Sequence, residues 1–385
     1  MTKQMTSRER VATALNHQEP DRVPLDIGAG QSTGLVVEAY ENLQAYTGIT
    51  GASGWLSKIF RVARLDDATL ARLGSDVRPL QLRPPRNWQP PASEAGTLID
   101  EFGIKWQQAP LPGGGHYWEQ TTFPLAEATI ADLDRYPWPD PHDPGRYAGL
   151  AEEAADLYHN TPYAILGDCG FKNHWEPVFL LCGMERALTD VVDNPAFTQA
   201  LLEKIAGLNF GVTRHFLEAT GKYLTAIRTS DDLATQSSLM MSPAAYRKLV
   251  KPYHQRYFRL IKEYTEAKIF FHSCGNIVAL LDDLIEAGVE VLNPVQVSAF
   301  KDPAEVKARF GDRLSFWGGI DTQWVLPSGS PEDVREEVRL RIRQFGPGGG
   351  FVAASVHNIQ PDVPPQNILA MADAVRELGT YPIRC

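Results

Sequence analysis

The chain has 385 residues, of which 43% are hydrophobic and 22% charged, and its formal net charge is −10. This composition is typical of a globular protein with a large core. The acidic balance argues against a nucleic-acid partner, because phosphate binding needs clustered lysine and arginine. No apolar segment approaches the roughly 18 residues of a membrane span, and the N-terminus lacks an apolar signal segment. Four widely spaced cysteines do not indicate a disulfide framework, so we expect a cytoplasmic protein.

The chain begins with a helix and a strand. Thr6 and Glu9 match a capping box, which predicts a helix that runs to about Asn16. The apolar residues 22–28 predict a strand that enters a glycine-rich loop. That loop has no G-x-G-x-x-G pattern and no following lysine, so it does not indicate a nucleotide-phosphate site.

Apolar segments alternate with helical patterns along the rest of the chain. The eight predicted strands cover residues 22–28, 76–83, 163–169, 223–232, 268–274, 289–294, 314–321 and 351–358. Eight strands joined by helical crossovers are the signature of a (β/α)8 barrel. The sequence therefore predicts an α/β protein with a TIM-barrel fold, in one domain over residues 1–385.

A β-hairpin is predicted as an insertion at about residues 97–124, where two strand-like segments flank a turn rich in proline and glycine. Its aromatic residues are Trp106, Tyr117, Trp118 and Phe123. They either cover a pocket or pack the insertion onto the barrel, and packing is the commoner role.

Nearly all of the predicted strands end in polar residues. Barrel active sites lie at the C-terminal ends of the strands, so polar side chains collected there predict the site. These residues are Asp26, Asp168, Asp231 and Asp232, His272 and Cys274, Asn293, Asp321, and His357 and Asn358.

Three of these residues form a candidate zinc site. His272 and Cys274 are two residues apart at the end of the predicted fifth strand, so they project to the same side. His357 ends the eighth strand and faces the same mouth. Three protein ligands with a fourth position open is how catalytic zinc is held. The alternative is a buried cysteine with histidines that serve only the core.

Other residues at the strand ends are candidates for catalysis and for substrate binding. A carboxylate here supplies a fourth ligand, orients a ligand, or positions and protonates a leaving oxygen, and the sequence does not choose among Asp168, Asp231 and Asp321. The candidate substrate-binding residues are Phe171, Trp175, Asn293 and Trp317. The three aromatic residues are able to hold a ring, although core packing is the commoner role for any one of them.

Five segments of the chain resemble the uroporphyrinogen decarboxylase superfamily, and in particular its zinc-dependent, corrinoid-linked methyltransferases. They are residues 6–11 with 20–24, residues 231–233 with 242–243 and 251–253, residues 272–275, residues 318–321, and residues 356–358 with 364–368. The resemblance covers nearly the whole chain and implies a single (β/α)8 barrel. The methyltransferases bind zinc through a His-x-Cys pair and a later cysteine, and His357 stands where that later cysteine is expected.

The chain departs from the superfamily pattern in two places. The decarboxylases hold the carboxylates of their tetrapyrrole with arginines in the loop after strand one, but residues 26–34 contain no arginine. This argues against a porphyrinogen substrate, because carboxylate recognition favours guanidinium groups. A neutral imidazole at His357, in place of a thiolate, makes the zinc site one charge more positive. Such a site is suited to polarise a leaving group rather than to activate a thiol.

The resemblance and the zinc ligands together predict methyl transfer from a small methylated substrate, such as a methoxylated aromatic, to a corrinoid. The corrinoid is expected on a partner protein, because this chain has no Asp-x-His-x-x-Gly segment to bind one. Two alternatives stay open: a lyase similar to uroporphyrinogen decarboxylase, in which Arg228 or Arg64 would bind the substrate, and a non-catalytic barrel that binds a small molecule. A homodimer is a candidate assembly.

Overall fold

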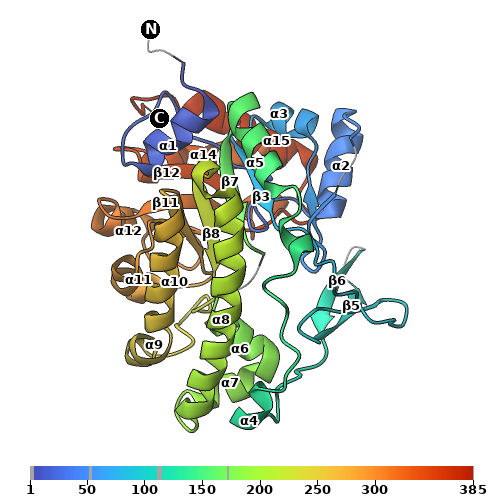
Figure 1. The fold of residues 1–385 in the computed structure, drawn as a ribbon. Helices are drawn as coiled ribbons and strands as arrows, with labels where there is room; N and C mark the ends of the chain where they lie inside the picture. The colour runs from blue at the N-terminus through green and yellow to red at the C-terminus, as the bar shows by residue number, and fades with distance from the viewer. Residues whose placement is uncertain (1–3, 52–53, 111–114, 171–172, 385) are drawn as a thin grey trace.

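The computed structural model describes residues 4–51, 54–110, 115–170 and 173–384 (Figure 1). Within these residues the central element is a curled sheet of seven parallel strands, in the order β12-β11-β10-β9-β8-β7-β3. Its strands are β3 (Val77–Gln81), β7 (Ala164–Asp168), β8 (Ala226–Ser230), β9 (Lys268–His272), β10 (Val291–Asn293), β11 (Ser315–Ile320) and β12 (Phe351–Ser355). The sheet confirms the predicted α/β barrel class and seven of the eight predicted strands.

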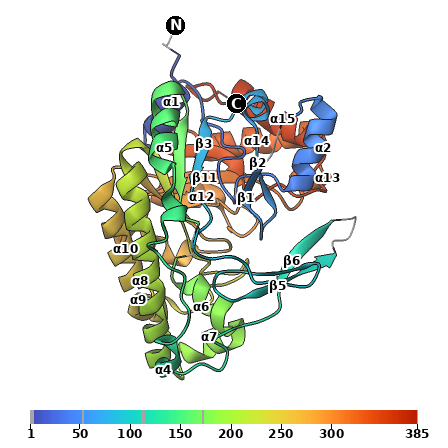
Figure 2. The same cartoon turned by 45° about the vertical axis from the view of Figure 1, so that its right-hand side comes forward.

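Helices separate successive strands and cover the outside of the sheet (Figures 1 and 2). The helices before β8 are α1 (Ser7–Leu15), α2 (Val37–Thr47), α3 (Asp67–Leu73), α4 (Ile130–Leu133), α5 (Leu150–Asn160), α6 (Trp175–Cys182), α7 (Met184–Asp190) and α8 (Pro195–Thr220). Those after β8 are α9 (Pro243–Leu249), α10 (Lys251–Tyr264), α11 (Leu281–Ala287), α12 (Pro303–Phe310), α13 (Val325–Ser328), α14 (Pro331–Phe345) and α15 (Pro365–Leu378).

The predicted first strand, residues 22–28, here called the strand-one segment and distinct from β1, is reduced to two isolated bridges, at Arg22 and Leu25. Leu25 pairs in parallel with Ala353 of β12, and its carbonyl accepts a hydrogen bond from the N–H of Asp76, beside β3, at 2.8 Å. The N–H of Leu25 donates to the Asp76 carboxylate at 2.9 Å. Because a side chain takes this N–H, a regular ladder does not form. The prediction of a full strand is therefore wrong, but the segment lies between both edge strands and closes the sheet.

The inside of the barrel is filled with apolar side chains from every strand of the sheet. This inner cluster includes Val77, Leu166, Ala226, Phe270, Val291, Trp317 and Val352. Helix α1 begins with the predicted capping box at Thr6 and contributes Val11 and Leu15 to the same cluster. It contacts β7 and β12, and thereby closes one end of the barrel. The strands finish at the opposite end, and the predicted strand-end site lies there.

Two small antiparallel sheets lie outside the barrel. The predicted hairpin is a three-stranded sheet of β4 (Thr97–Ile99), β5 (Lys105–Pro110) and β6 (His116–Gln120), which projects from the barrel in Figure 2. The prediction took residues 97–107 as one strand, whereas the structure divides them into β4 and β5 with a turn between the two. A second pair, β1 (Gly54–Ser57) and β2 (Val62–Arg64), was not predicted.

The aromatic residues of the insertion differ in burial. Trp106 packs against the main core, and its indole N–H donates to Asp100 at 2.9 Å. Tyr117 and Phe123 remain 44% and 42% exposed. Packing therefore accounts for Trp106, whereas Tyr117 and Phe123 are left on the surface.

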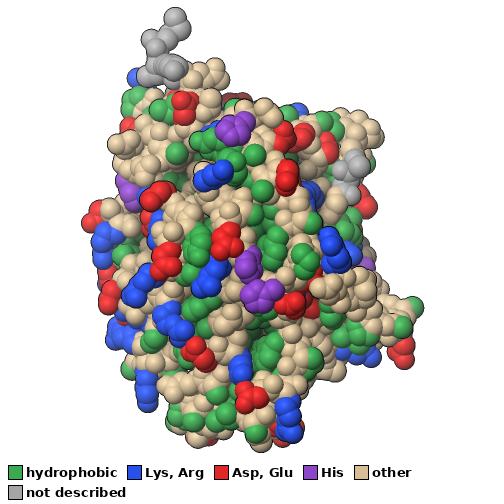
Figure 3. Space-filling view, viewed as in Figure 1, with side chains coloured by type: hydrophobic (Ala, Val, Ile, Leu, Met, Phe, Trp, Pro, Cys, Tyr) green, Lys and Arg blue, Asp and Glu red, His purple; other side chains and the backbone are tan. Residues whose placement is uncertain are grey.

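Acidic and basic side chains are interspersed over the face shown in Figure 3. Side chains of opposite charge also pair across neighbouring helices of the protein: Arg256 of α10 binds Glu203 of α8 at 2.9 Å, and Lys204 of α8 binds Asp134 at 2.7 Å. Throughout the part of the chain that the structure describes, none of the helices has both the length and the apolar character required to cross a bilayer.

Asp26, at the end of the strand-one segment, is completely buried. Its carboxylate accepts hydrogen bonds from the Thr33 hydroxyl at 2.7 Å, the Trp317 indole at 3.0 Å and the N–H of Ala29 at 3.1 Å. Burial nevertheless raises the pKa of Asp26 to about 6, from 3.8. The cost of desolvating the charge thus outweighs three hydrogen bonds that favour it.

This raised pKa predicts a pH dependence of stability. Between about pH 4 and pH 6 the folded protein holds a proton on Asp26 that the unfolded chain releases, so this group contributes stability at low pH that is lost as the pH rises through 6. The variant Asp26→Asn does not titrate. Its unfolding free energy, relative to wild type, is expected to rise by up to about 3 kcal/mol from pH 4 to pH 7. Urea titrations of both proteins at each pH measure this, and a constant difference would contradict it.

Candidate functional site

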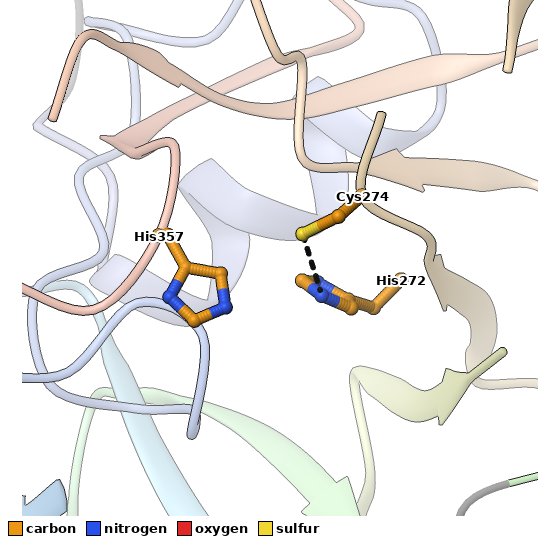
Figure 4. A group of neighbouring side chains, drawn as sticks. All are labelled: His272, Cys274 and His357. Carbon is orange, nitrogen blue, oxygen red and sulfur yellow. Dashed lines mark hydrogen bonds between the residues drawn. The ribbon is translucent and has the colours of Figure 1, made fainter. Parts of the chain in front are cut away.

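The structure brings the three predicted zinc ligands together. Figure 4 shows His272 and Cys274, at the end of β9, beside His357 from the segment after β12. Their ligand atoms all lie within 4.8 Å of one another. The Cys274 Sγ is 3.5 Å from the His272 Nε2, and the centroids of the two imidazole rings are 5.8 Å apart.

Asn293, the last residue of β10, sets the orientation of the His272 ring. The Asn293 Nδ2 donates to the carbonyl of Trp317 at 3.0 Å, so its Oδ1 faces the other way and accepts from the His272 Nδ1 at 2.6 Å. The Ser32 hydroxyl donates to the same Oδ1 at 3.1 Å. The proton of the neutral ring is therefore on Nδ1, and the Nε2 lone pair is directed toward the cluster.

His272 is held in the neutral form that a metal ligand requires. Only 4% of its surface is exposed. Burial lowers the pKa of His272 far below its ordinary value; nearby Asp232 raises it, while Arg228 and His357 lower it further. Since protons do not compete for the ring near neutral pH, its nitrogen is available to a cation.

The backbone around Cys274 is fixed by several contacts. The N–H of Cys274 donates to the Asp232 carboxylate at 2.8 Å, and that of Gly275 donates to the Gln296 side chain at 2.6 Å. Gly275 has a φ of +91°, and a Cβ there would lie 2.4 Å from the carbonyl oxygen of Thr235. Only glycine fits at this position, so the turn fixes the backbone that carries the thiol.

The donor set of the cluster fits zinc. Two imidazoles and a thiol are ligands that Zn²⁺ prefers, and three protein ligands are typical of an open site. Among the described residues this group contains no carboxylate. Cys274 and His357 are partly exposed while His272 is buried, so the cluster faces solvent on the side of the first two. The Nδ1 of His357 contacts the Asn358 side chain.

Two of the predicted catalytic aspartates accept hydrogen bonds from backbone N–H groups. Asp231 is fully buried, and its carboxylate accepts from the N–H groups of residues 174–176 at 2.6–3.3 Å, at the start of α6. Asp321 accepts from those of residues 323–325 at 2.9–3.2 Å, before α13. These bonds satisfy donors that the first turn of a helix leaves unpaired.

Asp231 also belongs to a second buried group, with His174 and His254. The His254 Nε2 lies 2.9 Å from the Asp231 carboxylate, and its Nδ1 lies 3.0 Å from the Tyr246 hydroxyl. All three members of the group are enclosed by the core. The Asp231 carboxylate thus accepts hydrogen bonds from four donors. Through these bonds it links the end of β8 to the start of α6 and to α10.

Asp168, the last residue of β7, is the predicted aspartate that contacts a cationic side chain. Its Oδ2 lies 3.4 Å from a guanidinium nitrogen of Arg228 and 3.4 Å from the side-chain amide of Gln31. Its Oδ1 accepts from the N–H of Gly170 at 2.7 Å. Gln31 and Ser32 belong to the glycine-rich loop after strand one, so this loop contacts both Asp168 and Asn293.

The predicted substrate-binding residues have different surroundings. Trp175 is fully buried in the main core. Trp317 is 1% exposed, donates to Asp26 and packs edge-on against Phe270 with 5.2 Å between centroids. The structure thus gives both tryptophans packing contacts, while Asn293 contacts His272. Phe171 lies outside the described residues.

The sequence placed Asp232 among the strand-end residues without giving it a role. It assigned no role at the site to Gln31 or Ser32, and it named Arg228 only under the lyase alternative. Arg228 had a usable signal, because a charge in the middle of a strand buried on both faces needs a partner. The contacts of the other three join segments far apart in the chain, and no local pattern indicates them.

The fold and the strand-end cluster define a parallel α/β barrel of the enzyme type, with its candidate site at the carboxyl ends of the strands. The family described as uroporphyrinogen decarboxylase (URO-D) matches residues 127–378. That is more than half of the chain, and the protein belongs to this family. Uroporphyrinogen decarboxylase of Alkalilimnicola ehrlichii is 24% identical over 394 aligned positions, covering 96% of this chain and 94% of the relative.

A second curated relative and a solved structure are also similar to this chain. Uroporphyrinogen decarboxylase of Pseudomonas fluorescens is 26% identical over 280 residues, covering 69% of this chain and 74% of the relative. Among solved structures, a methyltransferase from Methanosarcina mazei superposes with a TM-score of 0.64 at 18% identity, covering 97% of this chain and 99% of the other. This structural likeness shows that the two chains share a fold.

The surroundings of Asp231 predict a large effect on stability. In Asp231→Ala, three buried N–H groups and His254 lose their acceptor, which is expected to lower the unfolding free energy by about 3–5 kcal/mol. The control is Asp193→Ala, because Asp193 is exposed and its loss should change stability by less than about 0.5 kcal/mol. Chemical denaturation measures both variants; equal stabilities would show that Asp231 is not a structural residue.

Proposed function

We propose that the protein is a zinc-dependent methyltransferase that moves a methyl group from a small methoxylated aromatic to a corrinoid carried by a partner protein. The observation that carries this proposal is the convergence of His272, Cys274 and His357, with ligand atoms within 4.8 Å at the open end of the barrel. Membership of the URO-D family and the fold shared with a methyltransferase support it.

The three residues would hold zinc, with Asn293 fixing the ring of His272. When bound, the ion supplies Lewis acidity that stabilises negative charge on a departing oxygen. In the reaction, the C–O bond of the methyl ether breaks and its electron pair stays on the oxygen, which leaves as a phenolate. The new bond to the methyl carbon is formed by the electron pair of the reduced cobalt acceptor.

The composition of the cluster favours an oxygen leaving group. Two neutral imidazoles and one thiolate leave a divalent ion with one net positive charge, and a second thiolate would remove it. Extra positive charge increases the attraction for a developing oxyanion and reduces the nucleophilicity of a bound thiolate. An ether is therefore the favoured substrate rather than a thiol.

Decarboxylation is the competing activity, because the curated relatives reported above are named uroporphyrinogen decarboxylase. The loop formed by residues 26–34 contains no arginine, and its described side chains Gln31, Ser32 and Thr33 bind Asp168, Asn293 and Asp26. A tetrapyrrole with several carboxylates would lack cations in this loop. The test therefore includes uroporphyrinogen as a substrate.

Metal analysis tests the ligand set. Wild-type protein purified under reducing conditions is expected to contain about one zinc per chain, and Cys274→Ala should lose it together with turnover. Cys182→Ala is the matched control, because Cys182 is a free cysteine buried in α6 outside the cluster, and it should retain the metal. Zinc-free wild-type protein would count against the proposal.

Activity is tested with methoxylated aromatics, methylamines and uroporphyrinogen, each with and without a reduced corrinoid acceptor. Mass spectrometry should detect demethylated phenol and methylated corrinoid in equal amounts, and no decarboxylated porphyrinogen. Release of carbon dioxide without corrinoid would support a lyase instead. An intact protein inactive with every substrate would point to a binding protein.

The hydrogen bond from His272 to Asn293 predicts a weaker metal site in Asn293→Leu, which keeps the size of the side chain but removes the acceptor. Loss of such an orienting partner typically lowers metal affinity by about 10–100-fold. Competition with a chromophoric chelator measures the zinc affinity, and thermal unfolding checks the fold. An unchanged affinity would mean that Asn293 does not orient the ring.

A further inference from the structure

Arg228 lies in the inner layer of the barrel, next to the candidate metal cluster. It is the third residue of β8, paired in register with Asp168 of β7 and Phe270 of β9. Ala226, two residues earlier on the same face, belongs to the inner cluster. His272 is two positions beyond Phe270 on the neighbouring strand, so it lies one step closer to the mouth on the same face.

The guanidinium group of Arg228 is buried with most of its donors unused. Arg228 is 6% exposed. Across the described residues, the one acceptor of a hydrogen bond from its guanidinium is Asp168, at 3.4 Å, and the buried Nε has no partner. Arginine carries five N–H donors, and close pairs with carboxylates have distances of about 2.7–2.9 Å. The guanidinium therefore has capacity for a second anion.

Asp168 does not use up this capacity, because its oxygens are shared. One oxygen accepts from the N–H of Gly170 at 2.7 Å, and the other also accepts from Gln31 at 3.4 Å. By contrast, two arginines at the ends of β2 are already paired, Arg64 with Glu153 at 3.1 Å and Arg61 with Glu38. One loosely paired guanidinium suits one carboxylate and does not suit a polyanion.

We propose that Arg228 binds a carboxylate of the substrate, so that the favoured substrates are methoxyarenes that carry one carboxylate. This inference rests on the proposed function for the methyl group and on Arg228 for the anion. The planar edge of a guanidinium matches the two oxygens of a carboxylate, and the barrel interior weakens competition from water. Arg228 lies one step below His272 on the same inner face, so a substrate held at Arg228 by its carboxylate would direct its ring toward the metal cluster. Arg228 thus selects the substrate and orients its ether oxygen.

The test measures binding of two ligands of nearly equal shape, 4-methoxybenzoate and 4-methoxybenzamide, to the purified protein by calorimetry without an acceptor. Wild type is expected to bind the benzoate at least about tenfold more tightly than the amide, as a charged hydrogen bond allows. Arg228→Gln should abolish this preference, and Arg228→Lys should restore part of it. The matched control, Arg64→Gln, should keep it.

A second variant guards against misfolding of the Arg228 variants. Asp168→Asn retains the arginine but removes its competing carboxylate, so it should bind the benzoate several-fold more tightly than wild type. Equal binding of the two ligands by wild type overturns the inference. So does a benzoate preference that persists in Arg228→Gln, since the carboxylate would then bind elsewhere.

These measurements separate the inference from the proposed function. If the preference depends on Arg228 but no methyl group is lost with a reduced corrinoid, the methyl-transfer proposal fails and the anion site stands. If methoxyarenes are demethylated with no preference for the carboxylate, the anion site fails and methyl transfer stands.

Discussion

The register between β9 and β10 sets His272 opposite Asn293, and the candidate metal cluster depends on this pairing. Without the amide oxygen at 2.6 Å, the buried imidazole would have no partner for its Nδ1 proton, and its other nitrogen would not be directed toward Cys274. The amide is itself oriented by the carbonyl of Trp317, on the next strand. Three adjacent strands therefore determine the position of one nitrogen atom.

The strand ends divide their polar residues between support and chemistry. Asp231 and Asp321 each accept consecutive backbone N–H groups where a helix begins, and Asp26 anchors the loop after strand one. These carboxylates stabilise the loops that form the mouth. His272, Cys274 and His357 have side chains that meet one another instead. The hydrogen bonds from backbone N–H groups to these carboxylates hold the loops at the mouth in place. A metal site requires such support from its surroundings.

The family relationship and the site lead to different expectations. The reported curated relatives are named for decarboxylation of a porphyrinogen, whereas the residues at the mouth include two histidines and a cysteine in one group. A barrel keeps its core while its strand-end side chains change, since these residues contribute less to the packing between strands and helices. The local chemistry is therefore a better guide to activity here than relatives at 24–26% identity.

Much of the fold was predictable from the sequence, because alternation of apolar strands with amphipathic helices is a local property. It predicts seven of the strands and, through the spacing of His272 and Cys274, two of the three residues of the candidate cluster. The strand-one segment was predicted as regular because its composition is apolar, but the side chain of Asp76 takes its N–H. That competition involves residues about fifty positions apart and leaves no local pattern.

The sequence by itself determined the class of fold, the residues at the strand ends and the pair of ligands on one strand. Only the tertiary structure decided which strand-end aspartates accept backbone hydrogen bonds and that His357 reaches the His272–Cys274 pair. It also decided that Arg228, on the neighbouring strand, keeps unused hydrogen-bond donors. The physical reason is that a side chain's partners depend on the register and curvature of strands distant in sequence. A buried charge or imidazole takes its role from those partners.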